Sequence, residues 1–109
     1  MYAQLTMFDG PRSPELLAAA ERAENERIRP LLYSNPEIRD DLVAVYHLRQ
    51  PDGGKAILSI SRTEATLDKM IELIMTSELL PGEDPDLLPG PSRAERYEVT
   101  EVTQEAGAR

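Results

Sequence analysis

His47 is the one histidine of this 109-residue chain and the side chain best suited to acid–base chemistry. An imidazole with its ordinary pKa of about 6.5 accepts and releases protons near neutral pH, so His47 is our candidate general base. The neighbouring Tyr46 must point to the opposite side of a strand, because successive side chains alternate. The alternative for His47 is a structural position in the core or in a subunit interface.

Other polar side chains could hold a ligand near such a base. The phenols of Tyr33 and Tyr97 could donate to a ligand oxygen, although buried tyrosines also serve as packing residues. Arg62 ends a predicted strand, where a guanidinium could bind a carboxylate or phenolate through two bonds; the alternative is a loosely paired surface arginine. Asn35 could donate to a ligand carbonyl, but asparagine before Pro36 is also typical of a turn.

Composition and charge exclude several classes of function. A formal net charge of −8 disfavours nucleic-acid and anionic-membrane binding, because phosphate affinity depends on clustered cations. The lack of cysteine excludes disulfides, thiolate zinc sites and iron–sulfur clusters. The acidic segment 82–92 lacks the regular ligand spacing of a calcium loop. No apolar run approaches the ~18 residues of a membrane span, and we expect a cytoplasmic protein without metal or other cofactor.

Hydrophobic periodicity and turn residues divide the chain into alternating strands and helices. Ser13 and Thr63 are predicted helix caps, and Pro30 should kink or end the first helix. Residues 36–41 are predicted to be a polar connector, and Pro81-Gly82 to end the second helix. The predicted elements are, in order, a strand at 2–8, a helix from 14 to the stop at 34–36, strands at 42–49 and 55–62, a helix from 64 to 80, and a strand at 95–103.

This order predicts one α+β domain of the ferredoxin-like β-α-β-β-α-β type over residues 1–103. The chain length suits one compact domain. We expect the small, polar residues 104–109 to be a disordered tail. In such a domain both helices lie on the same face of an antiparallel sheet.

The two central strands form a hairpin whose turn is predicted at Asp52-Gly53. A two-residue turn there pairs His47 with Leu58 and Val45 with Ile60. On this register neither face of the hairpin is polar. In a sheet with one face exposed to water, apolar and polar residues would alternate along each strand. Because two helices cover only one face, we expect the other to be buried in a homodimer. His47 then lines either the pocket under the helices or the dimer interface.

Architectural features over nearly the whole chain point to a known family. They are the late proline in the first helix, the hairpin turn at Asp52-Gly53, the helix start Thr63-Glu64-Ala65 and the closing strand Glu95-Arg96-Tyr97-Glu98-Val99. With these features the chain resembles the antibiotic-biosynthesis monooxygenase (ABM) family of dimeric α+β-barrel proteins. The resemblance implies a homodimer whose two sheets close face to face, with a separate pocket between the helices and the sheet of each subunit.

The resemblance leaves two functions open. Some family members oxygenate polyphenolic or quinone-like substrates without metal or flavin, which implies a cofactor-independent monooxygenase acting on a polycyclic or phenolic small molecule. His47 would then be the base, and Tyr33, Tyr97, Arg62 or Asn35 would position the substrate. The alternative is a non-catalytic member that binds a small molecule or only dimerises. A cavity of about several hundred Å³ reached by His47 would favour the enzyme, and a collapsed interior the alternative.

Overall fold

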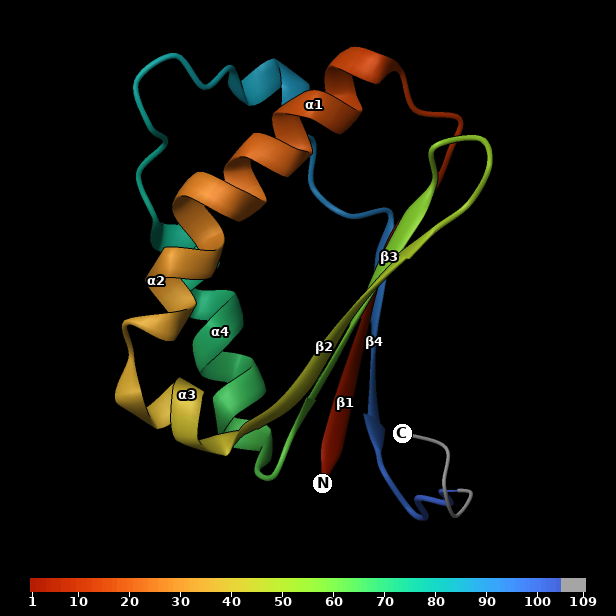
Figure 1. Cartoon of the computed structure of the whole chain (residues 1–109), viewed down its shortest axis with the longest axis vertical. Coiled ribbons are helices and arrows are strands. Elements are labelled where there is room, and N and C mark those ends of the chain that lie inside the picture. Colours follow the sequence, from red (N-terminus) through yellow and green to blue (C-terminus); the bar gives the residue numbers. More distant parts are fainter. Residues whose placement is uncertain (105–109) are drawn as a thin grey trace.

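The computed structural model describes residues 1–104 and contains a four-stranded antiparallel sheet with helices on one face (Figure 1). The strand order is β2-β3-β1-β4, which confirms the predicted ferredoxin-like α+β fold. Of the predicted tail, residues 105–109 lie outside the described part of the chain. The strands are β1 (Tyr2–Phe8), β2 (Leu42–Arg49), β3 (Lys55–Ser61) and β4 (Arg93–Glu98), the last ending before the predicted residue 103.

The turn between β2 and β3 is longer than predicted. Gln50 pairs with Gly54, with 2.7 Å between the Gln50 nitrogen and the Gly54 oxygen. A two-residue turn would need Pro51 in that place, and proline has no N–H to donate. The turn therefore takes a third residue, and Gly53 adopts the positive φ of 92° that this turn requires.

The longer turn shifts the register by one position and corrects the predicted faces of the sheet. His47 pairs with Ile57, and Leu58 pairs with Tyr46 on the opposite face. His47 and Ile57 face the helices, together with Val45. The face without helices is mainly apolar, and β1, β2 and β3 contribute Leu5, Met7, Ala44, Tyr46, Leu48, Ala56, Leu58 and Ile60 to it.

The first helical segment bends around Pro30 and does not end there. It consists of α1 (Pro14–Arg22), the π-helix η1 (Ala23–Ile28) and α2 (Arg29–Tyr33). The Ser13 hydroxyl accepts from the N–H of Leu16, as the cap prediction requires. In η1 the N–H of Arg29 bonds to the carbonyl of Glu24. This wider π turn lies directly before the proline, whose missing N–H and ring disfavour regular α-helix.

The predicted connector 36–41 is wrong, because these residues form α3 (Pro36–Asp41). The side-chain oxygen of Asn35 accepts from the N–H groups of Glu37 and Ile38, at 3.0 and 3.3 Å. Pro36 suits the first helical position, where no N–H is needed. Ile38 is fully buried, so the segment contributes to the core.

The helix α4 (Glu64–Thr76) is shorter than predicted and ends before Pro81-Gly82. Thr63 occupies its cap position, but its hydroxyl donates to Asp41 at 2.8 Å and makes no cap bond. The Thr66 hydroxyl donates to the same carboxylate at 2.6 Å, and the bonds from Thr66 and Thr63 lower the pKa of Asp41. Asp41 thus ties the start of α4 to the end of α3. A short 3₁₀ turn, η2 (Pro85–Leu87), precedes β4.

The hydrophobic core lies where α2, α3 and α4 meet the sheet. Its buried members are Leu32, Ile38, Leu67 and Met70. Figure 1 shows this packed end at the bottom, whereas α1 and the hairpin between β2 and β3 lie at the top. The core is therefore built at one end of the domain.

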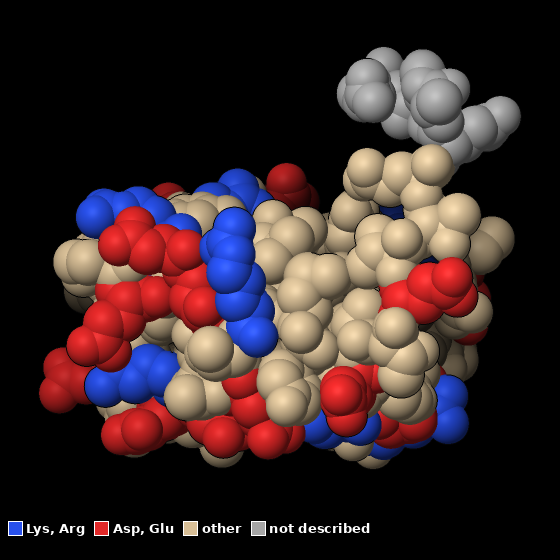
Figure 2. Space-filling view, turned by 90° about the horizontal axis from the view of Figure 1, so that it is seen from below, with Lys and Arg blue, Asp and Glu red and all other residues tan. Residues whose placement is uncertain are grey.

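Seen from below, charged side chains of both signs crowd over the helical layer (Figure 2).

Candidate functional site

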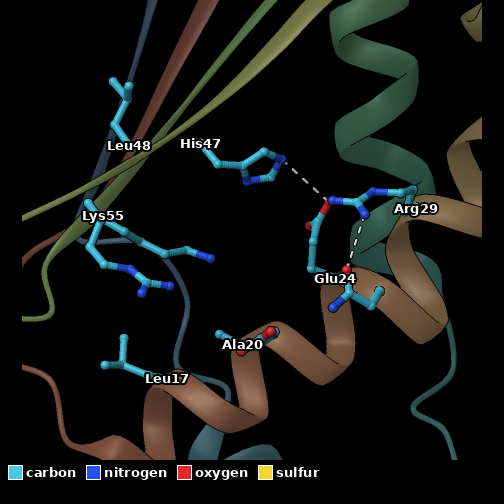
Figure 3. A pocket seen from close by; sticks show the side chains of 10 residues that line it. Leu17, Ala20, Glu24, Arg29, His47, Leu48 and Lys55 are labelled. Carbon is cyan, nitrogen blue, oxygen red and sulfur yellow. Dashed lines mark hydrogen bonds and ion pairs between the residues drawn. The ribbon is translucent and has the colours of Figure 1, made fainter.

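His47 lies on the helix-facing side of β2, opposite the first helical segment (Figure 3). Its Nε2 is 3.8 Å from Oε1 of Glu24, and the same oxygen is 3.7 Å from a guanidinium nitrogen of Arg29. The His47 side chain is 40% exposed and that of Glu24 is 19% exposed. A partly buried carboxylate therefore faces an imidazole that solvent and ligands can reach.

Glu24 interrupts the apolar stripe of the first helical segment. Leu17 and Ala20 line the space in front of the sheet on the α1 side of Glu24, and Ile28 does so on the other side. A residue at this spacing is normally apolar, because it faces the interior. The π turn of η1 carries the Glu24 carboxylate at this inward position, and π turns are frequent at functional sites.

A second ion pair anchors η1 on its outer side. Nε of Arg27 is 3.0 Å from Oε1 of Glu83, and both side chains are almost inaccessible to solvent. Arg27 also donates to the Ser77 hydroxyl at 2.7 Å, and the N–H of Leu80 donates to Glu83. The hydrogen bonds from Arg27 lower the pKa of Glu83. The segment after α4 therefore holds η1 in place.

Two cavities adjoin at His47. The larger has a volume of about 460 Å³ and extends toward the hairpin end, where Arg49 and Lys55 line it. The smaller, of about 220 Å³, reaches toward the core. Glu24, Arg29 and His47 line both. The imidazole thus stands at a junction, with Arg49 and Lys55 toward one side and the core residues Leu32 and Met70 toward the other.

This arrangement suits proton transfer. A neutral imidazole at His47 can take a proton from a ligand hydroxyl, and the carboxylate of Glu24 then stabilises the imidazolium. The cations of Arg29 and Lys55 favour the ligand anion that remains. Among residues 1–104, no three His, Asp or Glu side chains gather into a cluster that could hold a metal ion.

The structure brings only one of the predicted substrate-positioning residues to His47. Tyr33 lines the smaller cavity. The oxygen of Asn35 is used in the cap of α3. Arg62 lies at the other end of β3 from the hairpin and donates to the backbone oxygen of Asp40.

Tyr97 lies on the face of the sheet that the helices do not cover. It pairs in register with Ala3, and both side chains face away from the helices. Its hydroxyl donates to Glu95, and this bond raises the pKa of Tyr97. Tyr97 therefore cannot share a pocket with His47 within one subunit.

The cleft-lining residues Glu24, Arg29 and Lys55 were not predicted as site residues. The signal for Glu24 is present in the sequence, since it is an acidic residue within an apolar helical stripe. Lys55 and Arg49 share the helix-facing side only in the observed register. Their proximity could not be found from a hairpin with a two-residue turn.

The fold is shared with a solved structure described as a dimeric ferredoxin-like protein from an uncultured marine organism. The TM-score is 0.55, the match covers 95% of this chain and 90% of the other, and 12% of the aligned residues are identical. No protein-family model and no curated protein matches the sequence. Within residues 1–104, no helix has the length and hydrophobicity needed to cross a membrane.

Proposed function

We propose that the cleft binds a phenolic small molecule and that His47 removes its proton, as the first step of a cofactor-independent monooxygenation of the ABM type. The observation that carries this proposal is the position of His47 at the junction of two cavities, with Glu24 opposite its Nε2. The larger cavity is within the range of about 300–1,000 Å³ that small-molecule sites occupy. A collapsed interior would have favoured a protein that only dimerises.

The reaction requires little from the protein beyond a base and an anion site. The ligand hydroxyl gives its proton to the imidazole of His47, and its electron pair delocalises over the aromatic system. The anion then reduces O₂. In an anthrone-like substrate a methylene group becomes a carbonyl, so that one oxygen atom enters the product and the other leaves as water. Tyr33, at the edge of the smaller cavity, can donate to a ligand oxygen.

Oxygen uptake tests this proposal directly. We expect the wild-type protein to consume O₂ with anthrone- or quinol-like substrates in metal-free buffer. Replacing His47→Ala should lower the rate roughly 10²- to 10⁴-fold, the usual contribution of a general base. Tyr97→Phe is the control, since it removes a hydroxyl on the other face of the sheet. Absence of turnover across the panel, or full activity of His47→Ala, would contradict the proposal.

The alternative is a protein that binds such a molecule without transforming it. The observation that favours it is that Asn35, Arg62 and Tyr97 make other contacts and do not line the cleft, so that Tyr33 alone of the four predicted positioning residues lines it. Saturable binding of a quinol without any oxygen uptake would identify the protein as a binding module.

We also propose that the helix-free face of the sheet forms a homodimer. Tyr46 and Leu48 are 52% and 49% exposed on this face, beside the apolar Leu58. A continuous exposed apolar surface of this kind is typical of an interface. The structurally similar marine protein is described as dimeric.

Light scattering after size exclusion measures the assembly. We expect a dimer for the wild-type chain and a monomer for Leu58→Glu, because the new carboxylate would be buried against the partner sheet. Met75→Glu is the matched control, since Met75 is an exposed apolar residue on α4. A monomeric wild-type protein, or a Leu58→Glu variant that stays dimeric, would contradict this interface.

A further inference from the structure

Three cationic side chains gather at the hairpin end of the cleft. Arg49 and Lys55 are direct cross-strand partners, and both line the larger cavity with His47. The guanidinium of Arg12 and the Nζ of Lys55 both lie 5.4 Å from the centre of the Phe8 ring. Like charges placed directly opposite each other on a sheet are destabilising. The arrangement therefore needs a negative group to balance it.

Two acids, Glu21 and Glu24, line the same cavity, but within residues 1–104 neither forms an ion pair with these three cations. None of the ion pairs within residues 1–104 involves Arg12, Arg49 or Lys55. Nη1 of Arg12 is buried without a hydrogen-bond partner. Glu24, whose charge raises the pKa of Lys55, is already paired with Arg29 at 3.7 Å. Arg49 and Lys55 therefore line the cavity without an ion-pair partner among residues 1–104, in a chain with a net charge of −8, and this end of the cavity suits an external anion.

The lowered pKa of Lys55 agrees with an anion site at this position. Burial lowers the pKa of Lys55 most, the charge of Glu24 then raises it, and the charges of Arg12 and Arg49 lower it to a smaller extent. A bound carboxylate would replace the lost hydration of the ammonium and offset the repulsion from the two arginines.

We infer that the Arg49–Lys55 end of the cleft is a subsite for the carboxylate of an aromatic hydroxy acid. This inference rests on the proposed function, because it places the reacting hydroxyl at His47. Arg49 and His47 are two residues apart on the same side of β2, which separates them by about 7 Å. One benzene ring spans that distance. The substrate class is therefore an aromatic acid with the carboxylate and the phenol at opposite ends of the ring system.

Calorimetric titration with 4-hydroxybenzoate and the neutral 4-hydroxybenzamide tests the subsite. We expect the wild-type protein to bind the acid at least about tenfold more tightly than the amide, since charge-assisted bonds are about twice as strong as neutral ones. Lys55→Met should remove this preference. Lys69→Met is the matched control, because it alters the other lysine of the chain on α4 and should keep the preference. If Lys55→Met fails to fold, Arg49→Gln tests the same subsite, and it should also reduce the preference for the acid over the amide.

The outcomes separate this inference from the proposed function. Equal binding of acid and amide, binding of neither, or an unchanged preference in Lys55→Met would overturn the subsite. Competition by inorganic phosphate at the same affinity as the acid would show a general oxyanion site and overturn the assignment to aromatic acids. A preference that depends on Lys55, without oxygen uptake, would support the subsite and overturn the monooxygenase instead.

Discussion

The two ends of the helical layer differ in how they meet the sheet. At one end α2, α3 and α4 pack closely, and Ile38 and Leu67 are almost completely buried. At the other end the larger cavity lies between the first helical segment and the strands, and it is lined by His47, Glu24 and Lys55. Stability is thus concentrated where the side chains are apolar. The hairpin end can then carry charged groups and open space that would destabilise a core.

The largest effect is expected at the packed end. Ile38→Ala should lower the free energy of unfolding by roughly 2–5 kcal/mol, because it leaves a cavity beneath α3. The affinity for 4-hydroxybenzoate should stay unchanged in the fraction that is folded. Denaturant titration and calorimetry measure the two quantities separately. A loss of affinity at constant stability would show that the two ends are not independent.

Within the cleft, Glu24→Gln should slow oxygen uptake about tenfold, because a carboxylate about 4 Å from an imidazolium is worth roughly 1–4 kcal/mol. The amide keeps the shape of the side chain but cannot balance the positive charge. Stability should change little, since Glu24 is partly accessible. Stopped-flow oxygen measurements give the rate, and an undiminished rate would remove Glu24 from the mechanism.

Glu83 gives a pH-dependent test of the segment that holds η1. Its pKa in the folded protein lies below the ordinary value of 4.5, so its ion pair contributes stability above that pH. This contribution is lost as the pH falls through the lowered value. Glu83→Gln should lower the free energy of unfolding by about 1 kcal/mol at neutral pH. It should also make this free energy depend less on pH below 4.5, as urea titrations at several pH values would measure. The same pH dependence in the wild-type protein and in Glu83→Gln would contradict the role of this pair.

The smallest effect is expected for the stability of Lys55→Met. Removing the cation removes the free-energy cost of burying its charge and its repulsion from Arg49. The methionine side chain can still pack against the Phe8 ring. We therefore expect thermal unfolding at the same temperature or slightly higher, within about 0.5–1 kcal/mol. A clear loss of stability would mean that Lys55 has a structural role, and the unpaired cations would then need another explanation.

The sequence was sufficient for the fold and for the limits of most strands. Alternation and the Asp52-Gly53 turn predict β1 and β2 at their observed bounds. Two details of the fold depend on single proline residues. The missing N–H of Pro51 sets the register, and the sequence Asn35-Pro36-Glu37 is itself a helix start, which we had interpreted as a stop.

The candidate site could be predicted only in part. His47 was identified by its residue type alone, but its direction depends on the register and on which face the helices cover. Tyr33 reaches the smaller cavity because the helical segment continues past Pro30. Glu24 approaches His47 from a distant segment, and Lys55 shares the helix-facing side with His47 only in the observed register, so local patterns encode neither position.

Proton transfer inside the cleft is the central claim, and the ionisation of a bound phenol measures it most directly. 4-Nitrophenol changes colour when it loses its proton, so its titration can be followed free and bound. We predict that bound nitrophenol ionises at a pH lower by about one unit, and that His47→Ala removes most of this shift. An identical midpoint for free and bound nitrophenol, or a shift fully retained in His47→Ala, would contradict the claim.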